Sequence, residues 1–376
     1  MATESGQPRD HALMLEALAL AERGRYTTMP NPRVGCVIAI GDEIIGRGWH
    51  QRAGSAHAEV LALQEAGTRA RGATAYVTLE PCNTSGRTGP CTEQLIAAGI
   101  ARVVAAVEDP NPEVSGKGLA ALRAAGIETL AGICAAQAGA LNRGFFKRMR
   151  SGRPFVHAKM ASSIDGRTAM SSGESQWITG AAARAEVQKM RAQSCVMITG
   201  VDTVSIDDPR LTVRSEELGE NIGRQPALVI VDSTLRTPPA AQVLSESRAS
   251  GRRVIIACAA GADAQCAAQL RATGAELQEF STPASGRRVD LAALLAYLAA
   301  SEFNEAMLEA GATLFGAFMA ADLVDELSLF LAPRLFGQTA RPLAALDIAD
   351  IRDAKGLSII DAYPVGEDFL LRLAPR

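Results

Sequence analysis

The sequence predicts two consecutive α/β domains. Its 376 residues are more than a single typical core accommodates. An apolar hairpin pattern near the N-terminus is followed by alternating helical and strand-like runs, which favours a sheet with helices on its faces. A second series of such runs begins after a basic segment. We therefore place the boundary near residues 147–153 and take residues 1–150 and 151–376 as the two domains.

In the first domain, a helical spacing of apolar residues over His11–Glu22 precedes the hairpin. Its strands are expected at Val34–Ile40 and Glu43–Trp49, because Gly41 first in a two-residue loop is typical of a type II′ turn. The runs that follow predict helices at Ala58–Ala66, Thr92–Ala98 and Gly118–Ala125, and strands at Thr74–Leu79 and Ala101–Val107.

The second domain shows its own series of elements. Strand-like runs lie at Phe155–Met160, Ser194–Thr199, Ala227–Val231, Arg253–Cys258, Glu305–Leu308 and Glu326–Leu331. Helical runs lie at Ala181–Gln193, Leu291–Ala300 and Ala312–Ala321. The boundary segment, Leu141–Arg153, is strongly basic. We expect a solvated linker there; the alternative is a helix that caps the first domain and turns its charges toward a phosphate.

Composition excludes several classes of protein. The formal net charge of −3 gives no reason to expect a nucleic acid partner. The N-terminus has no basic region followed by an apolar core, and no apolar stretch approaches the ~18 residues of a membrane span. We therefore expect a cytoplasmic protein without a membrane or nucleic acid partner.

The seven cysteines are an odd number scattered along the chain. For a cytoplasmic protein this pattern indicates free thiols and metal ligands, not a disulfide framework. Cys36, Cys195 and Cys258 stand in strand-like runs and are expected to be buried.

The strongest functional signal is His57-Ala-Glu59, followed by Pro81-Cys82 and then Cys91. Zinc binds imidazole and thiolates, and three protein ligands leave one position open for water. The pattern matches the known H-x-E…P-C-x-x-C signature of zinc-dependent deaminases, although eight residues separate the two cysteines here. We expect His57, Cys82 and Cys91 to hold zinc and Glu59 to act as general base and then acid.

These residues allow two other interpretations. The histidine and the cysteines could be unrelated core residues, but the coincidence of the triplet, the Pro-Cys step and the spacing opposes this. A structural zinc site needs a fourth protein ligand. The nearest candidates, His50 and Cys36, lie in or beside the hairpin strands and do not favour it.

Over nearly its whole length the sequence resembles the RibD family of bifunctional riboflavin-biosynthesis deaminase/reductases. In the first domain the resemblance rests on Asn31-Pro-Arg-Val-Gly35, His57-Ala-Glu59, Glu80-Pro-Cys-Asn-Thr-Ser-Gly-Arg-Thr-Gly-Pro-Cys91 and Asp109-Pro-Asn-Pro112. In the second it rests on Lys159-Met-Ala-Ser-Ser-Ile-Asp-Gly-Arg-Thr168, Ser172-Gly-Glu-Ser-Gln-Trp-Ile-Thr179, Val204-Ser-Ile-Asp-Asp-Pro-Arg-Leu-Thr-Val-Arg214 and Glu309-Ala-Gly-Ala-Thr-Leu314. Two departures stand in the loop between the cysteines: Gly89 replaces the more usual proline, and Asn83-Thr-Ser85 replaces a histidine-containing version. Neither removes a ligand.

The resemblance implies a cytidine-deaminase-like three-layer α/β/α domain followed by a dihydrofolate-reductase-like α/β domain. It implies that the first domain deaminates 2,5-diamino-6-(5-phosphoribosylamino)pyrimidin-4(3H)-one to the 5-amino-uracil. It also implies that the second domain then reduces the ribosyl group to ribityl with NADPH. A homo-oligomer is expected as well.

Read by itself, the second half is ambiguous. It has no G-x-G-x-x-G after a strand, so a Rossmann fold has little support. The run Leu308–Gly316 is a strand, a glycine turn and a helix, which is either a plain connection or a place where backbone N–H groups meet a phosphate. Trp177 is either a core residue or a partner for a cofactor ring. Arg191 and Arg214 are by default surface charges, although arginine is also suited to a phosphate.

The resemblance assigns further residues of the second domain to ligands. Contacts to NADPH are implied for Ala161, Trp177, Thr203, Asp207, Ser233, Gly311, Ala312, Thr313, Leu314, Phe315, Gly316 and Ala317. Substrate contacts are implied for Ser175, Arg191, Leu211, Arg214 and Glu309. Ring opening of the sugar needs a proton donor, for which Lys159 and Asp207 are the candidates.

Two rival functions remain open at this point. A nucleic-acid deaminase with an unrelated appendage is disfavoured by the mild acidity and by an aromatic content of 4%. A degenerate zinc-binding scaffold is disfavoured by Glu59, for which a purely structural site has no use.

Overall fold

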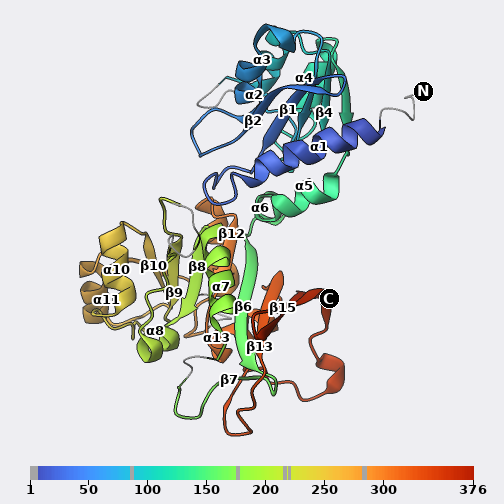
Figure 1. The fold of residues 1–376 in the computed structure, drawn as a ribbon. Coiled ribbons are helices and arrows are strands. Elements are labelled where there is room, and N and C mark those ends of the chain that lie inside the picture. Colours follow the sequence, from blue (N-terminus) through green and yellow to red (C-terminus); the bar gives the residue numbers. More distant parts are fainter. Residues whose placement is uncertain (1–6, 85–88, 175–177, 215–217, 219–221, 282–285) are drawn as a thin grey trace. The chain divides into compact units, whose positions relative to one another are not determined.

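The computed structural model describes residues 7–84, 89–174, 178–214, 218, 222–281 and 286–376. The chain divides into two compact units, Met1–Gly152 and Arg153–Arg376 (Figure 1). The division falls at the end of the basic segment. Each unit is a sheet covered by helices.

The first unit is built on a five-stranded sheet. Its order is β2 (Glu43–Trp49), β1 (Gly35–Ile40), β3 (Thr74–Val77), β4 (Arg102–Ala105) and β5 (Glu128–Ala131). Strand β1 runs antiparallel to both of its neighbours, whereas β3, β4 and β5 are parallel. The expected hairpin is present: Ile40 pairs with Glu43, and Gly41 has the positive φ, 59°, that the first loop residue of a type II′ turn requires.

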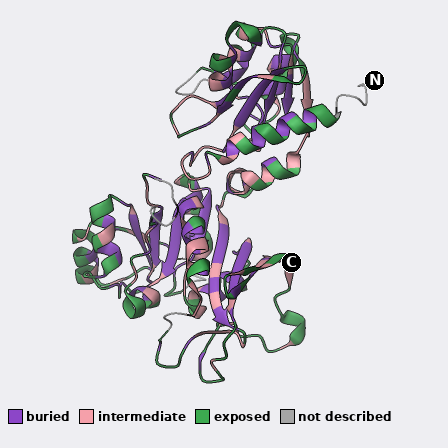
Figure 2. Ribbon diagram, viewed as in Figure 1, coloured by how far each residue is buried: buried purple, intermediate pink, exposed green. Residues whose placement is uncertain are grey.

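Helices cover both faces of this sheet. One face carries α1 (Gln7–Glu22) and α5 (Ala135–Leu141), and the other carries α2 (Ala58–Ala66), α3 (Cys91–Ala98) and α4 (Lys117–Ala124). Alternate residues of β1 enter the two cores, Val37 on the α1 side and Ile38 on the α2 side, as strand geometry dictates. The purple, buried strands of Figure 2 lie between these helical layers. The implied three-layer α/β/α arrangement is confirmed.

The basic segment is a helix, so the expectation of a solvated linker is wrong. Helix α6 (Arg143–Ser151) follows α5 directly and buries Phe146. The intervening Asn142 is buried and exchanges two hydrogen bonds with the main chain of Arg33, at 2.7 and 2.8 Å. The density of charge along the sequence suggested a solvated linker, because it does not reveal long-range contacts such as those of Asn142.

The second unit is built on a nine-stranded sheet. Its order is β11 (Glu276–Glu279), β10 (Val254–Cys258), β9 (Ala227–Val231), β8 (Val196–Gly200), β12 (Glu305–Leu308), β6 (Phe155–Ser163), β13 (Glu326–Ala332), β16 (Asp368–Pro375) and β15 (Leu357–Val365). In this order across the sheet, the first seven strands, β11 through β13, are parallel to their neighbours. Strand β16 is antiparallel to both β13 and β15. A separate pair joins β7 (Arg167–Ala169) to β14 (Arg341–Pro342).

Helices again cover both faces. Helices α12 (Leu291–Ala300) and α13 (Ala312–Ala320) pack on one face, and α7 (Ala181–Gln193), α8 (Val201–Asp207), α10 (Gln242–Ser250) and α11 (Ala264–Ala272) pack on the other. Within β8, Ile198 enters the core under α12 and α13, and Met197 enters the core under α8 and α10. All six strands and three helices expected in this half are present, with ends shifted by a few residues.

Two further expectations concern membranes and thiols. Among the described residues no helix is both long enough and apolar enough to cross a bilayer. All seven cysteines are free, and Cys36, Cys195 and Cys258 are buried as expected.

Candidate metal centre and ligand cavity

His57, Cys82 and Cys91 meet in the first unit. The ligand atoms of these three side chains lie within 4.8 Å of one another. His57 Nδ1 is 3.2 Å from Cys91 Sγ and 3.6 Å from Cys82 Sγ. His57 is the N-cap of α2, Cys91 opens α3, and Cys82 lies in the loop after β3. The structure thus assembles from three separate elements the ligand set that the sequence predicted.

The chemistry of these donors fits zinc with an open coordination position. Two sulfurs and one imidazole are the ligands that zinc prefers, and a group of three is typical of catalytic sites. Among the described residues the group has no fourth member. A hydrogen bond from Cys91 lowers the pKa of Cys82 to about 4 and raises that of Cys91, so a thiolate is present at neutral pH.

His50 and Cys36, the candidates for a fourth ligand, have other roles. His50 Nδ1 lies 3.2 Å from the carbonyl oxygen of Ala56, and its Nε2 lies 3.1 Å from Asn31 Nδ2. Its ring packs edge-on against His57, with 5.4 Å between the centroids. Cys36 is fully buried, and burial raises the pKa of its thiol well above the usual value. Neither residue belongs to the donor group.

Glu59 lies in the first turn of α2, two residues after His57. Its side chain is only 3% exposed. Burial raises the pKa of Glu59 to about 7. A carboxyl group with such a pKa exchanges protons readily near neutrality, which is the property that a general base and acid needs. The position and environment of Glu59 therefore agree with the role that the sequence predicted for it.

The close contact between helix α2 and strand β2 fixes where His57 and Glu59 lie. A Cβ atom on Gly46 would lie 2.2 Å from the carbonyl oxygen of Ala62, and one on Gly48 would lie 2.1 Å from that of Ala58. Real Cβ atoms essentially never approach so closely. The helix can lie flat on this strand only because both positions are glycine.

Sequence reasoning missed the role of Glu80, although the residue stands in a quoted motif. Glu80 is buried, and its carboxylate accepts hydrogen bonds from three main-chain N–H groups, those of Asp109, Gly116 and Leu119, at 2.9–3.1 Å. It thereby joins the loop of Cys82 to the start of α4. A glutamate directly before Pro81-Cys82 was the available signal, but its partners lie 29, 36 and 39 residues further along the chain.

A large cavity of about 1730 Å³ lies in the second unit. It is found where the parallel strands β6, β8, β9 and β12 end, next to the N-terminus of α13. The carboxyl ends of parallel strands are the usual ligand site of such sheets. The cavity is lined by fifteen residues that the resemblance implicated, namely Lys159, Ala161, Arg191, Thr203, Asp207, Leu211, Arg214, Ser233, Glu309, Gly311, Ala312, Thr313, Leu314, Gly316 and Ala317.

One implicated residue among those described, Phe315, does not line this cavity. The Phe315 side chain is 2% exposed and packs in the core under α13, so it does not face a ligand. The reason is helical periodicity, which turns this position of α13 toward the sheet. Ser175 and Trp177 lie outside the described residues.

Arg191 is not the surface charge that its sequence context suggested. Its guanidinium, 14% exposed, donates two hydrogen bonds to the Glu309 carboxylate, at 2.8 and 3.0 Å. Lys159 Nζ lies 3.5 Å from the same carboxylate. Burial alone would raise the pKa of Glu309, but Arg191 and Lys159 outweigh it and lower this pKa to about 2. Glu309 is therefore an anion that holds two cations at the cavity wall.

Other cavity residues lie nearer to solvent. Arg214 is exposed, in agreement with its default interpretation, and its main-chain N–H donates to Gln188. Asp207 is exposed at the end of α8. Arg288 and Arg341 also line the cavity, although nothing in their sequence context singled them out. Neither arginine stands in a sequence pattern that points to a ligand.

Comparison with known proteins agrees with this division of the chain. Residues 7–107 match the family described as cytidine and deoxycytidylate deaminase zinc-binding region, and residues 154–362 match the RibD C-terminal domain. The riboflavin biosynthesis protein RibD of Escherichia coli K12 is 45% identical, with 97% of this chain and 99% of the relative aligned. That of Haemophilus influenzae is 43% identical, with 98% of both chains aligned.

Solved structures show the same similarity. Acinetobacter baumannii RibD, form 2, superposes with a TM-score of 0.90 at 43% identity, over 98% of this chain and 99% of that one. A Thermotoga maritima protein superposes with a TM-score of 0.84 at 30% identity, over the same shares of the two chains. It is described as a diaminohydroxyphosphoribosylaminopyrimidine deaminase/5-amino-6-(5-phosphoribosylamino)uracil reductase.

Proposed function

We propose the reactions of this protein from one premise: the chain belongs to the RibD family, whose members are bifunctional deaminases and reductases of riboflavin biosynthesis. The chain is therefore a two-activity enzyme that uses zinc and NADPH. We assign the deaminase activity to residues 1–150 and the reductase activity to residues 151–376. The donor group of His57, Cys82 and Cys91 with the buried Glu59 is the observation that carries the proposal.

The first substrate in this proposal is 2,5-diamino-6-(5-phosphoribosylamino)pyrimidin-4(3H)-one. The description of the Thermotoga maritima relative supports this choice. Hydrolysis replaces the 2-amino group by oxygen and releases ammonia. The product is 5-amino-6-(5-phosphoribosylamino)uracil, which is the substrate of the second activity.

In the deamination step, His57, Cys82 and Cys91 hold the zinc ion. When bound there, zinc supplies Lewis acidity that makes a water molecule a better nucleophile. Glu59 accepts the proton of the attacking water and delivers it to the departing amino nitrogen. A pKa of about 7 lets one carboxyl group perform both transfers.

In the reduction step, the wall of the cavity orients the two reactants. NADPH supplies a hydride to C1′ of the ribosyl group, and opening of the sugar ring requires a proton on the ring oxygen. The N-terminal turn of α13, from Gly311, offers main-chain N–H groups to a cofactor phosphate. Ala161, Thr203, Asp207 and Ser233 line the rest of the proposed cofactor region.

The remaining cavity residues are assigned to the second substrate. Leu211, Arg214 and Glu309 are proposed to contact it, and the exposed guanidinium of Arg214 is suited to its phosphate. Arg191 is proposed to act in the same region while paired with Glu309. Lys159 is the preferred proton donor, because it lies deeper in the wall than Asp207 and contacts Glu309. Ser175 and Trp177 keep the roles that the resemblance implies.

The variant Glu59→Gln tests the acid/base role directly. It keeps the shape of the side chain and leaves all three zinc ligands in place. We expect the zinc content to be unchanged and ammonia release from the diaminopyrimidine to fall by at least about 100-fold. Zinc is measured by metal analysis and ammonia by a coupled assay. A variant that remained active would show that another group moves the protons.

The substrate class needs a separate experiment. Ammonia release and NADPH consumption are measured together on the diaminopyrimidine phosphate, and ammonia release is also measured on single-stranded RNA. We expect both signals with the pyrimidine and none with RNA. Activity on RNA alone would support the rival function of a nucleic-acid deaminase.

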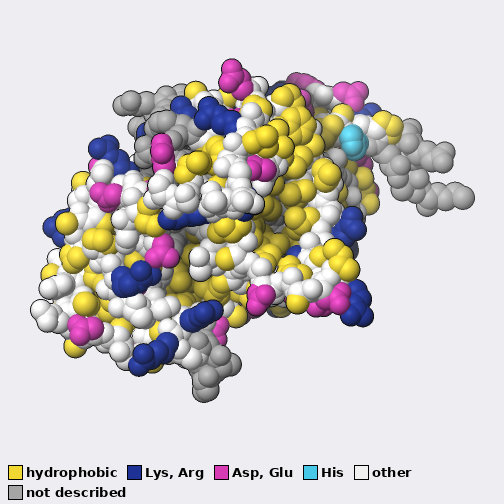
Figure 3. Space-filling model, turned by 90° about the horizontal axis from the view of Figure 1, so that it is seen from below, with side chains coloured by type: hydrophobic (Ala, Val, Ile, Leu, Met, Phe, Trp, Pro, Cys, Tyr) yellow, Lys and Arg dark blue, Asp and Glu magenta, His cyan; other side chains and the backbone are white. Residues whose placement is uncertain are grey.

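We also make proposals about the binding partners and the location of this protein. On the face shown in Figure 3, basic side chains of the described residues occur in small groups separated by acidic and uncharged ones, which does not favour a nucleic acid partner. Ile359 and Ile360 of the edge strand β15, and Phe369 of β16, are exposed apolar residues that fit a homo-oligomeric contact. We propose a cytoplasmic homo-oligomer, and a monomeric mass in sedimentation experiments would exclude the oligomer.

A further inference from the structure

The segment Asp208–Arg214, called here the 208–214 segment, forms part of the cavity wall between α8 and the residues that precede β9. Two of its residues have left-handed backbone conformations, Asp208 with φ of 40° and Leu211 with φ of 49°. At Asp208 this is the ordinary conformation of the C-cap of α8, but at Leu211 it is uncommon for a non-glycine residue and depends on the surrounding contacts. The surroundings of the segment therefore decide how Leu211 and Arg214 are presented to the cavity.

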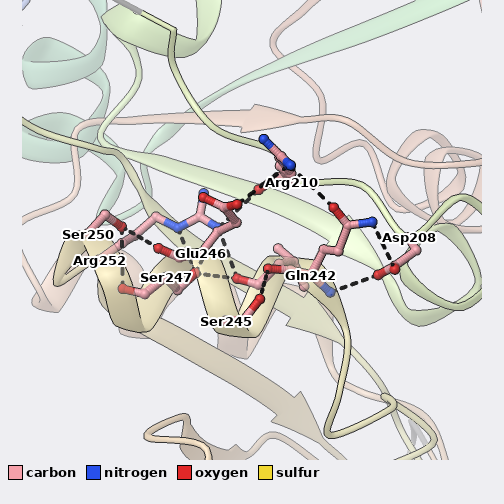
Figure 4. Close-up of polar contacts among 9 residues, drawn as sticks. Asp208, Arg210, Gln242, Ser245, Glu246, Ser247, Ser250 and Arg252 are labelled. Carbon is pink, nitrogen blue, oxygen red and sulfur yellow. Dashed lines mark hydrogen bonds and ion pairs between the residues drawn. The ribbon is translucent and has the colours of Figure 1, made fainter.

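Helix α10 holds the outer end of the segment (Figure 4). The main-chain and side-chain nitrogens of Gln242, the first residue of α10, donate to the two carboxylate oxygens of Asp208, at 2.8 and 3.1 Å. Arg210 Nε in turn donates to Gln242 Oε1 at 3.3 Å and lies 3.5 Å from a carboxylate oxygen of Glu246. These groups are largely exposed, so their contacts add little to the stability of the fold. They restrict the conformation of the segment.

The inner contact is made by Arg252, just after α10. Its guanidinium donates to the carbonyl oxygens of Leu211, at 2.6 Å, and Arg210, at 3.4 Å. It also donates to Ser247 Oγ, at 2.8 and 2.9 Å, and to the carbonyl oxygen of Val243, at 3.4 Å. One side chain thus joins two consecutive carbonyl groups of the segment to Val243 and Ser247 of α10.

Arg252 is an unusual residue for such a position. It is 7% exposed, and it forms no ion pair with any described residue, so all its acceptors are uncharged. Burial lowers its pKa to about 10, which still leaves it charged at neutral pH. Among the described residues, Glu246 favours the charged form of Arg252 at longer range, but no carboxylate pairs with it, and a buried charge without such a partner is unfavourable for stability. A residue that lowers stability in this way is expected near a functional site, where its contacts contribute to function and not to core packing.

Two further side chains, Arg191 and Gln225, bind the main chain of the segment at Thr212 and Val213. Arg191, which pairs with Glu309, also donates to the carbonyl oxygen of Thr212 at 3.1 Å. Gln225 exchanges two hydrogen bonds with the main chain of Val213, at 2.7 and 2.8 Å. The carbonyl groups of Leu211 and Thr212 are therefore held by different arginines, and within the described part of the chain Arg191 is the one that pairs with a carboxylate.

We propose that Arg252 is a positioning residue of the second active site, which holds the 208–214 segment in the conformation that binds the phosphoribosyl substrate. The inference rests on the proposed roles of Leu211 and Arg214 as substrate contacts. It predicts that loss of Arg252 weakens binding of the substrate of the reduction and leaves the other functions of the chain intact. Arg252 itself does not line the cavity, so it acts through the segment.

Three full-length variants separate this role from a purely structural one. Arg252→Met fills the same volume without charge and is expected to fold, since apolar replacements of buried charges are often neutral or stabilising. Arg252→Lys keeps the charge and can reach some of the acceptors. The control is Arg248→Ala, because Arg248 is an exposed arginine of α10 that donates to the carbonyl oxygen of Thr273, away from the segment.

Each variant is characterised by thermal unfolding, by ammonia release and by KM and kcat of NADPH oxidation with deaminated substrate. For Arg252→Met we expect at least about a tenfold rise in the KM for that substrate, a smaller change in kcat and normal ammonia release. Arg252→Lys should recover part of the KM, and Arg248→Ala should match the parent protein.

The outcomes are distinguishable. A parent enzyme that does not oxidise NADPH with this substrate would contradict the proposed function itself. An active parent with folded Arg252→Met and Arg252→Lys variants of unchanged KM would overturn the positioning role alone. If Arg252→Met fails to fold, the test depends on Arg252→Lys and Gln242→Ala. Gln242→Ala removes the side-chain contacts of Gln242 with the segment without burying a polar group. Unchanged KM values in both variants would also overturn the positioning role.

Discussion

Two carboxyl groups, the buried Glu59 and the half-buried Glu309, differ in their neighbours, and their pKa values move in opposite directions. Burial raises the pKa of Glu59 to about 7. Burial acts in the same direction on Glu309, but Arg191 and Lys159 outweigh it and bring the pKa to about 2. Opposite shifts of this kind separate a group that exchanges protons from one that only supplies charge. The lowered pKa suits Glu309 to supplying charge, and the raised pKa suits Glu59 to moving protons.

The ion pair of Glu309 makes stability depend on pH in a defined range. Because its pKa is lower in the folded protein than the ordinary value of 4.5, its contribution is fully present above pH 4.5 and is lost as the pH falls toward 2. The shift corresponds to about 3 kcal/mol. We expect the difference in unfolding free energy between the parent and Glu309→Gln to be constant from pH 7 to 5 and to shrink below pH 4.5.

Chemical denaturation at a series of pH values, followed by fluorescence or circular dichroism, measures this difference. Lys189→Met is a suitable control because Lys189 and Glu186 form an exposed pair with little effect on stability. A difference that stayed unchanged down to pH 3 would show that Glu309 is not held as an anion by Arg191 and Lys159.

At the scale of elements, the approach of α2 to β2 decides the geometry of the metal centre. The helix carries His57 at its N-cap and Glu59 in its first turn, so a displacement of α2 moves a ligand and the proton carrier together. Gly46 and Gly48 allow the close approach. The spacing of two glycines in one strand therefore bears on catalysis, although neither residue contacts the site.

The variant Gly48→Ala tests this packing. Its new Cβ atom would lie 2.1 Å from the carbonyl oxygen of Ala58, so the helix must shift. We expect a loss of about 1–3 kcal/mol in unfolding free energy and weaker zinc binding. Denaturation and competition with a chromogenic chelator measure the two effects.

Gly139→Ala is the matched control in the same unit. Gly139 lies inside α5, and a Cβ atom there would meet nothing within 4 Å. This change should stabilise the protein by up to about 1 kcal/mol and leave zinc binding unchanged. If Gly48→Ala behaved like Gly139→Ala, the close approach would have no role in holding the site.

The sequence predicted the elements that have regular apolar patterns. It missed β15 and β16, whose residues are mostly exposed or half-buried and therefore show no clear alternation. It also missed α10, where polar residues dominate, and α11, whose apolar residues are mostly alanines. For α6 the basic residues suggested a linker, because a pattern of charge does not record that Asn142 bonds to Arg33. Weakly patterned elements are defined by their partners in the fold.

At the scale of the whole molecule, each unit has its own hydrophobic cores. Two clusters of buried residues belong to the first unit and three to the second. The metal centre lies wholly in the first unit and the cavity wholly in the second. The two activities are therefore expected to respond separately to perturbation.

Removal of zinc tests this independence. Dialysis against a strong chelator should abolish ammonia release from the diaminopyrimidine. NADPH oxidation with substrate that has already been deaminated should remain within about twofold of its original rate, because no predicted zinc ligand lies in the second unit. Both rates are measured on the same sample, and ammonia release is measured again after zinc is added back. Parallel loss of both activities would mean that zinc supports the second unit as well.

The sequence alone predicted the donor group of His57, Cys82 and Cys91, the proton-carrying role of Glu59 and the family, because these depend on residue types at short, fixed spacings. Only the tertiary structure showed that Glu80 holds the loop to α4, that Arg191 pairs with Glu309, and that Arg252 reaches the 208–214 segment. The physical reason is the range of the interactions. A metal site requires a particular donor chemistry, which is visible in the sequence. A buried charge requires a partner that can lie anywhere along the chain, and only the folded chain shows which one it is.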